Sequence, residues 1–469
     1  MTSKRTSWLV LLVVFALIAA ACSSGGGTTT TAAGGGEGTT TTTAGGGGGA
    51  TTTTAPPGGG EEMKADFGVD VESKTINIGM LVDLTGIFSP LTTDIADAQI
   101  AYWDDVNANG GIDGWTVNLV IEDTNYNVDQ HIEKYEKIRN DVVALGHSTG
   151  SPTNVATLPK YKEDGMLFLP ISWYSGWGIP EFDGGLALEQ YTNYCIEAMD
   201  ILGFINEMGG TKVALATFPG DYGQDAAAGV KKAVEFYGME LVYDGEAAVI
   251  PGQDQTPVIT GIAQSGADWV FLTTNPSTAA ELMGGAAQAG FQGMWTGSVP
   301  SYDFRLLDSP VAPLIDQVYY QPGYNVVWGE DVPGAAKMQE VLTAAFPDRR
   351  PSDAFVIGWV YSISLHEVLK TAIANGDLTR AGVVAAANSL TGIDFGGLAP
   401  NQSYAGTPNE YVQRAIAMFK PSLEKYTAAG GADQVLSGEG TTTGSELVKD
   451  FFVSDAAKDF EYTEPCYQL

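Results

Sequence analysis

From Thr75 onward, the sequence alternates short apolar runs with amphipathic stretches, which is the pattern of parallel strands joined by helices. The order strand, loop, helix and strand occurs twice, first from Ile76 and again from Lys212. About four hundred residues lie beyond the N-terminal tract, more than one hydrophobic core usually accommodates. We therefore predict an α/β protein of two similar lobes, each built on a doubly wound parallel sheet.

The periodicity of the apolar residues sets the expected elements. For the first lobe it predicts strands at 76–82, 117–121, 142–145 and 166–171, with helices at 94–107 and 129–139. For the second lobe it predicts a helix at 191–208 and strands at 212–218, 239–243, 269–274 and 294–297. The segments after Tyr324 are mostly helical, including 356–373, and could pack on either lobe.

The N-terminus has the parts of a secretory signal. Lys4 and Arg5 precede the apolar residues 8–18, which are too few to span a membrane, and alanines at 19–21 form a small-residue cleavage site. Cys22 comes next, and a cysteine at this place resembles the bacterial lipoprotein signal, in which it carries the lipid. We expect a signal peptide at 1–21 and a lipid anchor at Cys22 on the outer face of the bacterial cytoplasmic membrane. The alternative is an ordinary signal peptide with Cys22 as an exposed thiol.

Composition describes the tether and the surface of the chain. Residues 22–62 are mostly Thr and Gly, so they cannot bury enough apolar surface to offset the entropy of ordering, and we predict a disordered tether. The whole chain has 56 acidic and 23 basic residues, a formal net charge of -33, which repels nucleic acid and anionic lipid headgroups. We interpret the charge as a solubility device of an exported protein.

The chain has three cysteines, and a lipidated Cys22 would leave Cys195 and Cys466 as a possible disulfide in an oxidising compartment. The alternative is that Cys195, which shares a helical stripe with Met199, is a packed thiol. Sequence alone does not decide between the two. The three histidines are scattered and no Cys/His cluster exists, so we expect no metal and no cofactor.

Four segments carry a resemblance to a known family: IGMLVDLTG at 78–86, NANGGIDG at 107–114, GHSTG at 146–150 and GDYG at 220–223. In this order they resemble the type I periplasmic-binding fold of the leucine/isoleucine/valine-binding proteins, the solute receptors of ABC importers. The resemblance covers about 75–413. It implies a three-strand hinge, with lobe 1 at 63–191 plus 325–408 and lobe 2 at 192–324 plus 409–469. It also implies a small-molecule ligand in the cleft, no chemistry on that ligand, and partners consisting of membrane permease subunits with their ATPases.

The resemblance places candidate ligand contacts in the loops that follow the strands. These are Ser148, Thr149, Ser151, Ser172, Trp173, Tyr174, Tyr222, Asn275, Tyr302 and Asp303. Amino-acid receptors have an acidic residue for the ligand's ammonium where this chain has Val299, although Asp303 lies four residues on. A zwitterion would then leave a poorly compensated buried charge, so an amide, a urea-like solute or an organic acid becomes a candidate beside amino acids. The aromatic residues in these loops suit a flat or apolar ligand, or a cation held over ring faces.

Two other functions compete with import. The segment 146–150 fits Gly-x-Ser-x-Gly, the nucleophile elbow of α/β-hydrolases, and would make Ser148 a nucleophile. Its base would have to be His366, the only later histidine, but His366 lies within a predicted helix and no His-Gly-Gly oxyanion motif is present. The second competitor is a ligand sensor that signals to a membrane partner, which would use the same cleft.

Overall fold

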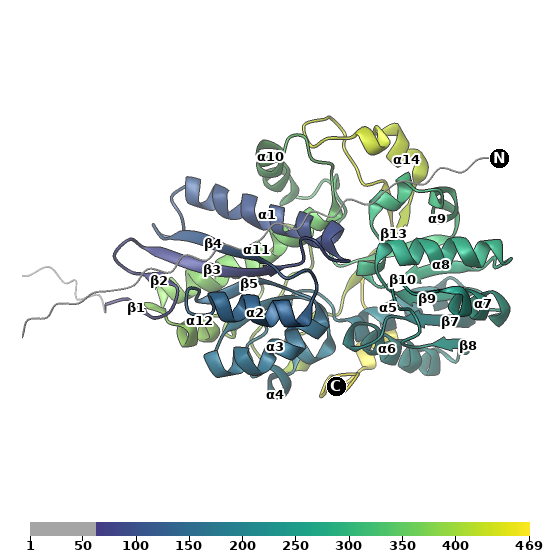
Figure 1. The fold of residues 1–469 in the computed structure, drawn as a ribbon, viewed down its shortest axis with the longest axis horizontal. Coiled ribbons are helices and arrows are strands. Elements are labelled where there is room, and N and C mark those ends of the chain that lie inside the picture. The colour runs from purple at the N-terminus through teal and green to yellow at the C-terminus, as the bar shows by residue number, and fades with distance from the viewer. Residues whose placement is uncertain (1–61) are drawn as a thin grey trace, which may run out of the picture. The chain divides into compact units, whose positions relative to one another are not determined.

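The computed structural model describes residues 62–469, which fold around two β-sheets (Figure 1). The predicted signal peptide, the anchor Cys22 and all but the last residue of the predicted tether lie outside the described residues. Within 62–469, no helix combines the length and apolar character needed to cross a membrane.

The first sheet is parallel, with the strand order β4-β3-β5-β6. Its strands are β3 (Thr75–Val82), β4 (Thr116–Asp123), β5 (Ala144–Thr149) and β6 (Leu167–Ile171), and the short β2 (Val69–Asp70) pairs antiparallel with β3. The helices between them are α1 (Ser89–Ala108), α2 (Val128–Ile138) and α3 (Ser151–Asp164). Every residue of β5 and β6 is buried; β6 is apolar throughout, whereas β5 ends in the buried polar residues His147, Ser148 and Thr149.

The second sheet has seven strands in the order β14-β13-β11-β10-β9-β7-β8. Its parallel part consists of β7 (Lys212–Thr217), β8 (Glu240–Gly245), β9 (Trp269–Thr273), β10 (Met294–Gly297) and β11 (Tyr319–Gly323). Strands β13 (Ile416–Pro421) and β14 (Ser445–Phe452) extend it antiparallel. Its helices are α5 (Tyr194–Glu207), α6 (Asp221–Tyr237), α7 (Thr256–Ser265), α8 (Pro276–Gln288) and α9 (Ala312–Val318).

After β11 the chain returns to the first sheet. The helices of this return are α10 (Ala335–Ala345), α11 (Asp353–Ala374) and α12 (Arg380–Ala387). Helix α11 packs against α1, and Gly358 permits the close approach, because a Cβ there would lie 2.1 Å from the carbonyl oxygen of Ile95. Strands β1 (Lys64–Ala65) and β12 (Asp377–Leu378) pair beside them. The structure thus places these segments, for which the sequence left both lobes open, on the first lobe.

Short elements complete the chain. They are α4 (Pro180–Asp183), α13 (Pro408–Tyr411), α14 (Leu423–Ala428) and α15 (Asp455–Asp459), with 3-10 turns η1 (Ser175–Gly178), η2 (Val299–Ser301), η3 (Phe304–Asp308) and η4 (Gly431–Asp433). An isolated parallel bridge joins Thr192 to Gln413, where the chain enters and re-enters the second sheet's side. The two sheets and these crossings confirm the predicted fold class.

Candidate functional site

A small cavity lies beyond the carboxyl ends of β5 and β6, where ligands of open α/β sheets bind. Residues from the elements around the first sheet and from those around the second sheet both form its walls. The first side contributes Phe88, Leu91, Thr92, Tyr126, Thr149, Gly150, Ser151, Ile171 and Trp173. The second side contributes Tyr194, Tyr222 and Pro300. We call this cavity the cleft; its volume of about 20 Å³ is room for one or two water molecules, so its walls are nearly in contact.

Five of the twelve residues that line the cleft are aromatic. Phe88 precedes α1 and lies with its ring centroid 4.8 Å from Tyr126 and 6.3 Å from Tyr222 of α6. Tyr222 is in turn 4.7 Å from Tyr194, at the start of α5. The edge-on contact between Phe88 and Tyr222 joins the two sides of the cleft, and Trp173 is only 1% exposed beside these rings. An apolar or flat ligand would replace ring contacts of the same kind.

The polar end of the cleft is the start of helix α3. Gly150 caps this helix with φ 97°, and a Cβ there would lie 2.7 Å from the Tyr126 ring, so the turn requires glycine. Thr149 and Ser151 flank it with buried hydroxyls, and the Ser151 Oγ lies 2.5 Å from that of Ser172. The first N–H groups of a helix lack partners within it and carry a partial positive charge, which favours an anion at this position.

Two buried carboxyl groups lie close to the cleft without lining it. Burial raises the pKa of Asp221, at the start of α6, to about 7, although the Ser151 hydroxyl acts in the opposite direction. Burial also raises the pKa of Glu197 to about 8, even though the backbone N–H of Val299 donates to it at 2.8 Å. Both groups therefore have a large protonated fraction at neutral pH. No Lys, Arg or His is among the residues that line the cleft.

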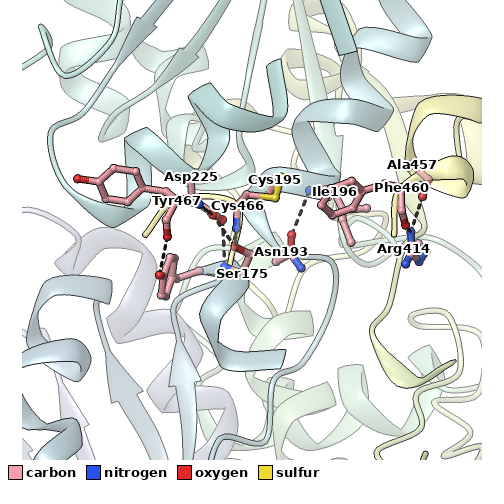
Figure 2. Close-up of a disulfide and its surroundings, with 11 residues drawn as sticks. Ser175, Asn193, Cys195, Ile196, Asp225, Arg414, Ala457, Phe460, Cys466 and Tyr467 are labelled. Carbon is pink, nitrogen blue, oxygen red and sulfur yellow. Dashed lines mark hydrogen bonds between the residues drawn. A yellow bond between two sulfur atoms is a disulfide. The ribbon is translucent and has the colours of Figure 1, made fainter. Parts of the chain in front are cut away.

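Polar contacts join the two sides at the margins of the cleft. At one margin, Arg305 of η3 reaches Asp94 of α1 at 2.6 Å. At the other, the backbone N–H of Ser175 donates to Asp225 of α6 at 3.0 Å. We call residues 460–469 the C-terminal tail; there Cys466 forms a disulfide with Cys195 of α5 (Figure 2). The described conformation is therefore closed.

The C-terminal tail takes part in the contacts at the second margin. Figure 2 shows Cys466 and Tyr467 beside Ser175 and Asp225. The backbone N–H of Cys466 donates to the Ser175 hydroxyl at 2.8 Å, and that of Tyr467 donates to Asp225 at 3.3 Å. Burial raises the pKa of Asp225 to about 7, although hydrogen bonds from Ser175 and from the backbone N–H of Tyr467 lower it.

Comparison with known proteins classifies the fold. A family model described as periplasmic binding protein matches residues 75–421, well over half of the chain. The chain belongs to the periplasmic binding protein family. Among curated protein sequences, none matches the chain.

Solved structures similar to this periplasmic binding protein include substrate-binding proteins of ABC transporters. A fatty acid ABC transporter substrate-binding protein from Thermomonospora curvata has 26% identity and a TM-score of 0.76, over 86% of this chain and 97% of that one. A branched chain amino acid ABC transporter protein from Thermus thermophilus, with bound valine, has 17% identity and a TM-score of 0.69, over 82% and 98%. An R. palustris solute binding protein in complex with 4-hydroxybenzoate has 14% identity and a TM-score of 0.66, over 81% and 97%.

Four of the candidate contacts of this binding protein line the cleft: Thr149, Ser151, Trp173 and Tyr222. The other six do not: Ser148, Ser172, Tyr174, Asn275, Tyr302 and Asp303. Ser172 bonds to Ser151 from behind the lining, and the Tyr174 hydroxyl donates to the carbonyl of Tyr467 at 2.7 Å.

The candidates on the second side have partners of their own. Asn275 donates from Nδ2 to the Ser277 hydroxyl at 2.6 Å, and the Tyr302 ring stacks on Tyr319 with centroids 5.4 Å apart. Asp303 forms an ion pair with Arg305 at 2.9 Å, so its carboxylate is already neutralised. It therefore does not replace the acidic residue that amino-acid receptors have at the position of Val299. These side chains support the loops that carry the cleft rather than facing it.

Sequence reasoning missed most of the aromatic lining. Phe88 and Tyr126 follow β3 and β4, and the rule that ligands bind beyond strand ends would have included both loops. Tyr194 lies in the first crossing rather than after a strand, and no local pattern distinguishes it from a packed helix residue.

Ser148 lacks the surroundings of a nucleophile in this binding protein. Its side chain is fully buried, and its hydroxyl donates to Asn154 Oδ1 at 2.5 Å. The nearest histidine is His131, with Nε2 at 3.2 Å, whose Nδ1 has no hydrogen-bond partner and whose pKa burial lowers to about 3. His366 instead bonds to Tyr102 at 2.8 Å. The arrangement offers neither access nor an oriented base.

Proposed function

We propose that this protein is the solute receptor of an ABC importer and that it captures a small organic acid with an apolar or aromatic body. The observation that carries the proposal is the composition of the cleft, where aromatic rings surround the start of α3 and its two hydroxyls. The rings would contact the body of the ligand, while the Ser151 hydroxyl and backbone N–H groups at the start of α3 would hold its carboxylate. Two similar structures, a fatty acid ABC transporter substrate-binding protein and a solute binding protein in complex with 4-hydroxybenzoate, support this class.

Binding would require the two sides to separate and close again. The closed cleft of about 20 Å³ has no room for an organic acid, so the contacts at both margins must open first. We propose lobe boundaries at 63–191 plus 325–408 and 192–324 plus 409–469, which fit the crossing where Thr192 pairs with Gln413. The ligand would stabilise the closed form by population shift, and the permease with its ATPases would recognise that form.

No chemistry on the ligand is proposed, because the only candidate nucleophile, Ser148, is buried and without an oriented base. We also propose that Cys22 carries a lipid that holds the receptor at the outer face of the membrane. The sequence pattern of residues 1–22, basic residues, an apolar stretch and alanines before Cys22, supports this proposal.

Titration calorimetry with benzoate, hexanoate, leucine and the neutral analogue benzyl alcohol tests the ligand class. We expect benzoate and hexanoate to bind, and benzyl alcohol to bind at least about tenfold more weakly, because the alcohol lacks the carboxylate that the start of α3 would hold. Ser151→Ala should weaken carboxylate binding about tenfold, because one hydroxyl donor is lost. Ser277→Ala, an exposed helix-start serine outside the cleft, is the matched control and should bind as the unchanged protein does. Tighter binding of leucine than of either carboxylate would refute the proposed class.

A further inference from the structure

A second cavity lies outside the cleft, beside two chain crossings. Its volume is about 170 Å³, room for a molecule of several heavy atoms. One wall comes from the segment that leaves β6 for the second sheet, with Trp177, Asp183 and Glu189. The other wall comes from the segment that returns to it, with Gln402 and Tyr411. We call it the hinge cavity, because the Thr192–Gln413 bridge directly follows both walls.

Glu189 is the unusual residue of the hinge cavity. Glu189 is 6% exposed, and its Oε1 is buried without a hydrogen-bond partner. Burial raises the pKa of this carboxyl group, and the neighbouring Asp225 and Asp183 raise it further, so the empty site favours the protonated group and a cation beside it would favour the carboxylate. A buried, unpaired carboxyl group destabilises a fold unless something compensates it. Within the described residues, nothing pairs with Oε1.

The buried side chains that line the hinge cavity include spare acceptors and, apart from the Glu189 carboxyl group itself, no spare donor. Gln402 is 3% exposed, and its Oε1 is also buried without a partner, while its Nε2 donates to the carbonyls of Ser403 and Tyr411. The other side-chain donors that line it have partners: Trp177 Nε1 donates to Ser172, the Tyr404 hydroxyl to Gln190 and the Tyr411 hydroxyl to Gly178, while the exposed Asn388 uses one of its two Nδ2 hydrogens on Gly185. A ligand that fits this inventory must donate hydrogen bonds.

The charges around the hinge cavity point the same way. Asp183 and Glu189 line it, and no Lys, Arg or His does. The rings of Trp177, Tyr404 and Tyr411 add surfaces that attract cations. A bare metal ion fits poorly, because no group of three or more His, Cys, Asp or Glu within 62–469 could hold one.

We propose that the hinge cavity is a second binding site, for a small organic cation that carries an ammonium or guanidinium group. The cation would donate to Glu189 and Gln402 and lie against the three aromatic rings. Because the cation would contact both crossing segments, its binding would affect the movement of the two lobes relative to each other. This site is separate from the cleft and does not depend on the proposed organic acid.

Calorimetry with n-butylammonium, methylguanidinium and the neutral control n-butanol tests the site. We expect both cations, and not the alcohol, to bind the full-length protein. Glu189→Gln keeps the size of the side chain and removes its charge, and should weaken cation binding at least about tenfold. Glu181→Gln changes an exposed acid on the neighbouring helix α4, outside the cavity lining, and should leave binding unchanged.

A second variant keeps the test decisive if Glu189→Gln folds poorly. Ala187 lines the same cavity two residues before Glu189, so Ala187→Lys would tether an ammonium group inside it. This variant should lose cation binding and melt at least as high as the unchanged protein. A crystal grown with n-butylammonium should show the cation beside Glu189. The proposal is overturned if neither cation binds at millimolar concentration, if n-butanol binds equally well, if Ala187→Lys still binds the cations, or if the cation occupies only the cleft.

Discussion

The disulfide between Cys195 and Cys466 should be a main source of stability, because it joins residues 271 positions apart. In the chain-entropy description, closing a loop of this length lowers the entropy of the unfolded chain by an amount worth about 5.6 kcal/mol at 25 °C. The variant Cys195→Ala/Cys466→Ala restores that freedom. Some of the loss is offset because the C-terminal tail also regains freedom in the folded variant. We therefore expect the free energy of unfolding to fall by about 3 to 5 kcal/mol.

Equilibrium unfolding in guanidinium chloride, followed by tryptophan fluorescence, measures this loss. Both proteins should carry Cys22→Ser, so that the bonded pair holds the only other cysteines of the chain. The reference protein with reductant added should approach the variant, and the variant alone should not respond to reductant. The slope of the transition should rise in the variant, since an unfolded chain without the cross-link exposes more surface. A difference below about 1 kcal/mol would refute the argument that the bond restrains the unfolded chain.

Three further predictions concern the cleft, pH and the anchor. Tyr222→Phe should lower the free energy of unfolding by about 1 to 2 kcal/mol in a denaturant titration, because the hydroxyl bonds to Thr274 and Ser298. Tyr222→Ala should lower it by about 3 to 5 kcal/mol, since the residue is 2% exposed. Equal stability of the two variants and the unchanged protein would contradict this packing. The free energy of unfolding should fall as pH rises from about 4 to 8, because folding raises the pKa values of buried carboxyl groups and the folded state therefore binds more protons than the unfolded chain. Calorimetric melting at pH 5 and pH 8 checks the sign of this effect. A higher melting temperature at pH 8 would count against it. The carboxyl groups responsible are Asp183, Asp353, Asp221, Asp225 and Glu197. Cys22→Ser should move the protein from the membrane to the soluble fraction of fractionated cells, and retention in the membrane would argue against a lipid at that residue.

Apolar runs predicted strands such as β6 and β9 well, because these buried parallel strands hide both faces from water. Strand β5, expected at 142–145, lies at Ala144–Thr149, because its last three residues are polar side chains that are nevertheless buried. Helix starts were predicted less well. Helix α1 begins at Ser89 rather than at residue 94, since Pro90 looks like a loop residue but fits the first turn of a helix. Strand β14 gave no signal, because it is an edge strand with mostly exposed or half-exposed side chains.

The candidate site was predicted only in part for a similar reason. Thr149 and Ser151 follow a strong strand signal, so local pattern and resemblance place them in the cleft. Phe88 reaches the cleft through its contacts with Tyr126 and Tyr222, which lie far along the chain. Likewise, the pairing of Cys195 depends on where the last residues return, which no local sequence pattern encodes.

The interleaved order of the chain bears on how the protein acquires its structure during export. The first sheet lacks α11 and α12 until long after β6 has been made, and the second sheet lacks β13 and β14 until the last residues arrive. Domains usually fold in the order in which they leave the ribosome, but here neither half has all its parts early. We expect the emerging polypeptide to stay loosely structured, a state that suits threading through a secretion channel, and to mature only once its end has crossed.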